Sequence, residues 1–130
     1  ADWQRQPGTP IVEEAKTVRL LVTLDRAELH TRADARFDRM IAGGALEEAR
    51  ALADLNLDPA LPAMRAIGVR PLVSAARGET SLEAAAAAAK METRQYVKRQ
   101  ETWLRRNMSS WRSINTQYME SYMREIFAFI

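Results

Sequence analysis

The sequence predicts a mostly α-helical chain with one or two short strands, and three observations lead to this prediction. Apolar residues recur every three or four positions between residues 25 and 107, and capping residues and glycines bound these stretches. One short run, residues 17–24, is instead β-branched and continuously apolar. Of the 130 residues, 47% are apolar and 28% charged, which is ordinary for a folded domain and argues against disorder.

The first residues predict a connector followed by a buried strand. Residues 1–16 are polar and contain two prolines and a glycine, as connectors do. Residues 17–24 read as a buried strand, which needs a sheet to join. The chain also opens abruptly at Ala1-Asp2-Trp3 rather than at Met. We therefore expect it to be a fragment of a longer protein.

Two helices are expected after this strand. Asp25 can cap the first helix, which should end at the stop signal Gly43-Gly44. Its apolar positions recur at helical spacing and should face the core: Leu29, Ala33, Phe37, Met40 and Ile41. The second helix covers residues 46–55, and its apolar face consists of Leu46, Ala49, Leu52 and Ala53.

A loop and a third helix are expected over the next residues. Residues 61–72 predict a loop that leads into a helix with Pro71 in its first turn, where the missing N–H does no harm. Gly78 is placed to end this helix.

A long helix is the strongest prediction of the C-terminal half. Thr80 and Glu83 have the spacing of a capping box, and the helix is expected to run from Ser81 to about Asn107. Its alanine run, residues 84–89, can pack close to a neighbour because the side chains are small. Two further elements are expected after it: a short strand over residues 111–117 and an amphipathic segment over residues 119–130.

The residue types exclude several kinds of site. There is no cysteine, which excludes disulfides and thiolate metal sites and favours an intracellular location. His30 is the only histidine, so a zinc site or a catalytic triad based on histidine would have to be built around it. No run of about 18 apolar residues occurs, so we expect no transmembrane helix and no membrane partner. A glycine-rich phosphate loop of the Walker type is also missing from the sequence.

The end of the long helix is strongly basic and carries most of the functional signal. Net charge is only +2, but Arg94 to Arg112 holds six cations and a single acid, Glu101. Helical spacing places Arg94, Lys98, Thr102 and Arg105 on one face, with Gln95, Arg99 and Arg106 beside it and Tyr96, Trp103 and Leu104 toward the core. This face either binds nucleic-acid phosphates and bases or is a solvated face that complements the helix macrodipole.

Two other groups of arginines leave the same kind of choice open. Arg65 and Arg70 flank Gly68, an arrangement that permits close backbone approach to a ligand or is simply a surface turn. The arginines of the first helix can bind a pyrophosphate or, as the favoured interpretation, pair with acids of the same helix: Arg32, Arg36 and Arg39 with Glu28, Asp34 and Asp38.

Three motifs in order resemble the C-terminal portion of the tRNA dimethylallyltransferase (tRNA isopentenyltransferase) family. They are Arg32–Met40 followed by Gly44–Glu48, then Leu61–Arg70, and then Thr93–Arg105, of which the third is the most specific. The resemblance covers roughly residues 17–106, and the spacing between the motifs also fits. The chain departs from the family at Val69-Arg70-Pro71, where Tyr-Arg-Gln is frequent.

The resemblance implies an activity, a fold and partners. Such enzymes transfer a dimethylallyl group from dimethylallyl diphosphate to N6 of the adenosine 3′ of the anticodon of tRNA. The implied fold is the C-terminal part of an α/β P-loop-kinase-like fold, with residues 1–16 as the connector from a missing inserted helical domain and residues 17–130 in the core domain. The nucleotide- and ATP-binding phosphate loop, the general-base Asp and most Mg²⁺ contacts would lie in the missing N-terminal half. Full-length protein would be a cytoplasmic enzyme, and this chain alone would be inactive.

The resemblance also assigns roles to residues. The segments expected to contact the tRNA anticodon stem-loop are Arg65, Ala66, Ile67, Gly68, Val69 and Arg70, together with Lys98, Arg99, Gln100, Glu101, Thr102, Trp103, Leu104 and Arg105. Arg36, with Arg32 as its neighbour, matches a diphosphate-binding arginine. We expect no catalytic and no metal-ligating residue in this chain. Two alternatives stay open at this point: a stand-alone helical nucleic-acid-binding module and a protein-interaction domain.

Overall fold

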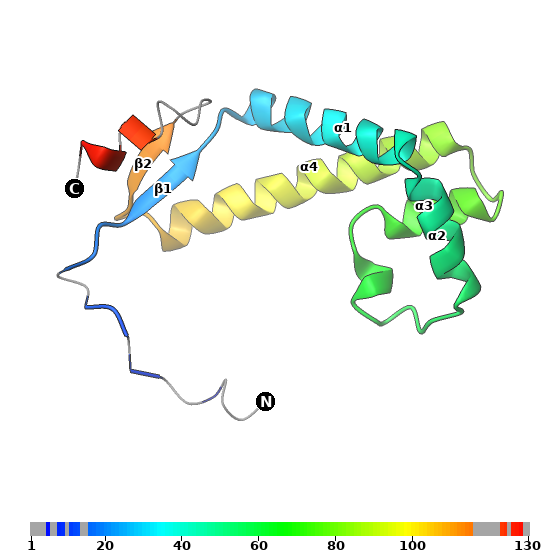
Figure 1. Cartoon of the computed structure of the whole chain (residues 1–130), viewed down its shortest axis with the longest axis horizontal. Coiled ribbons are helices and arrows are strands. Elements are labelled where there is room, and N and C mark those ends of the chain that lie inside the picture. Colours follow the sequence, from blue (N-terminus) through cyan, green and yellow to red (C-terminus); the bar gives the residue numbers. More distant parts are fainter. Residues whose placement is uncertain are drawn as a thin grey trace. The chain divides into compact units, whose positions relative to one another are not determined.

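The structure is a computed structural model that describes residues 5, 8–9, 11–13, 16–115, 123–124 and 126–128. The chain forms two compact units (Figure 1). Residues 24–109 make a helical unit, and the described residues of 1–23 and 110–130 make a strand unit. Most of the expected connector 1–16 and of the expected amphipathic segment 119–130 lies outside the described residues.

The strand unit contains a parallel pair of short strands. β1 covers Leu20–Thr23 and β2 covers Arg112–Asn115, in a register that pairs Leu20 with Arg112 and Val22 with Ile114. Parallel strands need a long crossover connection, and the whole helical unit lies between them in the sequence. The prediction of a buried first strand was wrong, because β1 pairs on one side only within the described part and Val22 remains 48% exposed.

The first helix has the predicted limits, and the second begins and ends one residue earlier than predicted. α1 covers Arg26–Ala42, and the carboxylate of its N-cap, Asp25, accepts from the backbone N–H groups of Ala27 and Glu28. The Gly43-Gly44 stop is confirmed, since Gly43 caps α1 and Gly44, with a φ of 100°, starts α2 over Ala45–Asp54.

The rest of the helical unit is a short 3₁₀ turn and two helices. The turn, η3, covers Ala63–Arg65, and α3 covers Val69–Ala76 with Pro71 in its first turn, as predicted. α4 covers Leu82–Asn107. The capping box predicted from Thr80 was wrong by one residue: Ser81 is the N-cap and accepts from the N–H of Ala84, so Glu83 sits one position earlier in the first turn.

Glu83 makes the stability of α4 sensitive to pH. Its pKa lies below the ordinary value because its own backbone N–H and the Ser81 hydroxyl bond to the carboxylate. A pKa lowered by folding adds stability above the unfolded value, and this stability is lost as the pH falls. We expect Glu83→Gln to lower the free energy of unfolding near neutral pH and to match wild type below about pH 3. Urea unfolding at both pH values checks this; a difference that persists in acid would contradict it.

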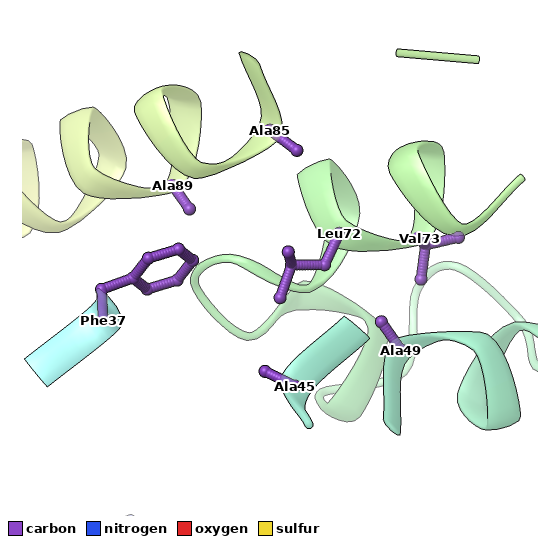
Figure 2. Packing of buried hydrophobic residues seen from close by; sticks show 7 residues of the cluster. All are labelled: Phe37, Ala45, Ala49, Leu72, Val73, Ala85 and Ala89. Atoms are coloured by element: carbon purple, nitrogen blue, oxygen red, sulfur yellow. The ribbon is translucent and has the colours of Figure 1, made fainter. Parts of the chain in front are cut away.

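A small, alanine-rich core holds the four α-helices together. Figure 2 shows the ring of Phe37, from α1, facing the small side chains of the neighbouring helices. The buried set is Phe37, Ala45, Ala49, Leu72, Val73, Ala85 and Ala89. The alanine run of α4 therefore packs closely, as predicted, and Ala89 is fully buried. Met40 was predicted to face this core, but it is 48% exposed. Phe37 and Ile41 are the residues at this end of α1 that pack in the core, and Met40 lies to the side of them.

Ion pairs fix the register of α1 against α4, which run antiparallel side by side (Figure 1). Three pairs join these helices within the described residues: Arg26 with Glu101 (2.8 Å from Nε), Asp34 with Arg94, and Asp38 with Lys90 (2.6 Å). Exposed pairs contribute only about 0.2–1 kcal/mol each, so they select a register more than they stabilise it. The same-helix pairing predicted for α1 holds for Arg32 and Glu28 alone; Asp34 and Asp38 pair across to α4 instead.

Candidate RNA interface

The two predicted RNA-binding segments meet at one surface hollow in the helical unit. This hollow has a volume of about 270 Å³ and is called the arginine hollow here. Its lining comes from the η3–α3 segment and from α4: Arg65, Ala66, Ile67, Arg70, Glu92, Gln95 and Arg99. Residues more than 20 positions apart in the sequence thus place three guanidinium groups around a single depression.

The arginines of this hollow are free to bind an anion. Within the described part of the chain, Arg65 and Arg70 take part in no ion pair, and Arg99 only lies over the Tyr96 ring, 5.8 Å from its centroid. Arg70 also stands in the first turn of α3, where a cation is disfavoured by the helix dipole. The helix dipole therefore gives no reason for a cation at this position. Three such groups can form bidentate bonds to phosphate oxygens.

The structure explains why position 68 is a glycine, which the sequence did not reveal. Its φ is 88°, and an added Cβ would lie 3.2 Å from the Phe37 ring and 3.5 Å from Ala89. The close approach predicted at this glycine is therefore to the core of the protein itself. Its N–H donates to Oε2 of Glu92 at 3.2 Å.

A second hollow, of about 600 Å³, follows along α4 and is called the terminal hollow here. It is lined by Lys98, Arg99, Thr102, Trp103, Arg106 and Asn107. Trp103 and Tyr96 were predicted to face the core, but they are 50% and 44% exposed because the buried face of α4 ends at its alanine run. Trp103 thus presents an aromatic surface beside cations, which suits stacking with an unpaired base.

Other predicted site residues are engaged elsewhere. Arg94, expected to begin the cationic face, pairs with Asp34. The cations of α4 that have no ion-pair partner in the described part of the chain therefore begin at Lys98. Glu101 bonds to Arg26, and Arg32 to Glu28. Arg36 is exposed and makes no ion pair with any described residue, so it is the free cation of the predicted diphosphate pair.

Sequence reasoning missed Glu92 as part of the site. Two signals could have found it. Glu92, Gln95 and Arg99 follow each other at spacings of three and four, which places them on one stripe of a helix. Gly68 begins α3 without a side-chain oxygen, so an acceptor from another element can serve as a cap there.

Two structural findings limit the chemistry of this chain. Among the described residues, no group of three or more His, Asp and Glu side chains is arranged to hold a metal ion. No helix in the described part is both long and apolar enough to cross a membrane.

Comparison with known proteins identifies the family. The family model described as IPP transferase matches residues 1–107, most of the chain. The chain belongs to the IPP transferase family. The tRNA dimethylallyltransferase of Parvibaculum lavamentivorans is 52% identical over 128 residues, which are 98% of this chain and 40% of the relative. That of Cereibacter sphaeroides is 55% identical over 115 residues, 88% of this chain and 39% of the relative.

Solved structures of the family agree with the fold. A tRNA delta(2)-isopentenylpyrophosphate transferase from Staphylococcus epidermidis matches with a TM-score of 0.75 and 30% identity over 87% of this chain and 37% of its own. The full-length tRNA isopentenylpyrophosphate transferase from Bacillus halodurans matches with a TM-score of 0.75 and 29% identity over 86% and 37%. The chain spans about two fifths of the length of the curated relatives it matches. The predicted fold class, mostly helical with two short strands as the C-terminal part of an α/β fold, is confirmed.

Proposed function

We propose that this chain is the RNA-binding C-terminal portion of a tRNA dimethylallyltransferase. The observation that carries the proposal is the convergence of arginines from two separate segments, Arg65 and Arg70 with Arg99, on the arginine hollow, where none of the three has an ion-pair partner among the described residues. Family membership favours this function over a stand-alone nucleic-acid-binding module or a protein-interaction domain.

The proposed reaction explains why the protein needs cations that bind the RNA phosphates. An adenosine in a stacked anticodon loop has to leave the stack before its N6 can attack dimethylallyl diphosphate, and a protein that holds the flanking phosphates stabilises the extruded base. The arginine hollow supplies those contacts, and the exposed Trp103 supplies a surface for a neighbouring base. The leaving diphosphate carries developing charge that a fixed cation stabilises, a role we assign to Arg36 with Arg32 beside it.

The remaining parts of the enzyme belong to residues outside this chain. We propose that a phosphate loop, a general-base Asp and the ligands of Mg²⁺ lie in an N-terminal half, with residues 1–16 as a connector and residues 17–130 in the core domain. The metal would stabilise charge on the diphosphate. The described residues of this chain offer no cluster of ligands for it. The whole enzyme would act in the cytoplasm.

Prenyl transfer tests this proposal directly. Full-length protein, incubated with dimethylallyl diphosphate and tRNA, is expected to add the prenyl group to N6 of the adenosine 3′ of the anticodon, measured by mass spectrometry of the digested nucleosides. A tRNA with guanosine at that position is the control and should stay unmodified. Residues 1–130 alone should bind RNA without turnover; turnover by this chain would overturn the placement of the catalytic groups elsewhere.

A further inference from the structure

The N-terminus of α3 cannot be capped by its own N-cap residue. That residue is Gly68, which has no side-chain oxygen. A Ser, Thr, Asn or Asp does not fit there, because the added Cβ would press on the Phe37 ring at 3.2 Å and the backbone φ is 88°. Among the first N–H groups of the helix, that of Val69 bonds to the Ala66 carbonyl at 3.1 Å and Pro71 has none. The N–H of Gly68 still needs an acceptor, and no side chain of its own can supply one.

Glu92 supplies that partner from α4. Its Oε2 accepts from the N–H of Gly68 at 3.2 Å, in a half-buried position and 24 residues away in the sequence. A carboxylate at this place is doubly suited, since it satisfies an orphan donor and lies at the positive end of the α3 dipole. The bond ties the segment that contains Arg65 and Arg70 to the face of α4 that contains Arg99.

Glu92 acts on the backbone of this segment rather than on its guanidinium groups. It lines the arginine hollow together with Arg65, Arg70 and Arg99, but no ion pair joins it to any of them within the described residues. The three guanidinium groups therefore have their hydrogen-bond donors available for a ligand. Their relative placement nevertheless depends on a bond that a carboxylate makes beside them.

We propose that Glu92 is a positioning residue for RNA binding: by capping α3 from α4, it holds the arginines of both segments around one phosphate group of the RNA. This inference rests on the proposed function, because it takes RNA as the ligand of the arginine hollow. It adds a residue outside both predicted RNA-binding segments.

A positioning role and a purely electrostatic role predict opposite changes in RNA affinity when Glu92 is replaced by alanine. Removing a negative charge from a cationic hollow should strengthen the binding of a polyanion. Removing the bond that aligns the cations should weaken it, since loss of one such bond costs roughly a three- to tenfold factor. Glu92→Ala removes charge and acceptor together. Glu92→Gln removes the charge but keeps an acceptor oxygen for Gly68.

The experiment compares these variants in the full-length protein. Wild type, Glu92→Ala, Glu92→Gln and the control Glu48→Ala, an exposed acid on α2 outside both hollows, are titrated with a fluorescent anticodon stem-loop RNA. We expect Glu92→Ala to weaken binding about three- to tenfold and to raise KM for tRNA with kcat unchanged. Glu92→Gln should bind as well as wild type or more tightly, and Glu48→Ala should stay within about twofold of wild type.

Hydrogen exchange provides a second readout that does not depend on RNA. The Gly68 amide should exchange faster in Glu92→Ala than in Glu92→Gln or wild type. Equal or tighter RNA binding by Glu92→Ala would overturn the inference, as would weakened binding in Glu92→Gln to the same extent. If wild type itself fails to bind the stem-loop, the proposed function fails instead, and faster exchange of Gly68 would still establish the cap.

Discussion

Replacing Phe37 by alanine is expected to lower the free energy of unfolding by about 3–5 kcal/mol, the range for truncating a buried phenylalanine. Phe37 is 7% exposed and is the one large ring in a core otherwise made of alanine, leucine and valine (Figure 2). Gly68 lies against this ring and Ala89 belongs to the same core, and neither has a side chain large enough to move into the space left behind. The lost contacts and the remaining cavity should therefore both lower the free energy of unfolding.

Urea unfolding followed by circular dichroism measures this effect. Met40→Ala is the matched control, since Met40 lies on the same helix but is 48% exposed and should change the free energy of unfolding by less than about 1 kcal/mol. A Phe37→Ala loss below about 1 kcal/mol would show that the ring is not the centre of this core. Because the ring packs against Gly68, the variant should also loosen the segment that carries Arg65 and Arg70.

Neutralising the arginine hollow should produce the largest loss of RNA binding. In the full-length protein, Arg65→Gln, Arg70→Gln and Arg99→Gln together remove three cations that have no acidic partner in the described part of the chain. At about 1 kcal/mol for each exposed charge-assisted bond, affinity for the stem-loop RNA should fall roughly a hundredfold. The slope of log K against log salt should become shallower by about two, since each phosphate contact releases counterions.

Fluorescence anisotropy over a range of salt concentrations measures both quantities. A charge-matched control replaces three exposed arginines outside both hollows, Arg39, Arg50 and Arg77, by glutamine. It should keep most of the affinity and of the salt slope. Equal losses in the two triple variants would mean that RNA responds only to total charge and that the hollow has no special role.

Helix limits were largely predictable because they depend on neighbouring residues. Asp25 caps α1, the glycine pair separates α1 from α2, and Pro71 sits in the first turn of α3, as predicted. Each of these signals acts over four residues or fewer. The one-residue error at Thr80 arose because two adjacent hydroxyl residues compete for the same cap, and local spacing does not decide between them.

Predictions about which side chains are exposed or paired were less successful. Tyr96 and Trp103 were placed toward the core, but both are about half exposed, since burial along α4 is set by where its neighbours end. Arg94 was assigned to a free cationic face, but its partner Asp34 is 60 residues away. Helical periodicity shows which residues share a face and does not show what that face meets.

The helices and most of their limits follow from residues close together in the chain, and three motifs in order indicate the family. Which cations are available to a ligand depends instead on how distant segments pack. Lys90, Arg94 and Arg26 pair across two antiparallel helices, whereas Arg65, Arg70 and Arg99 converge with no acidic partner in the part of the chain that the structure describes. The physical reason is range: caps and helical propensity are local, but an ion pair or a cap such as that of Glu92 on Gly68 forms only after distant segments have packed together.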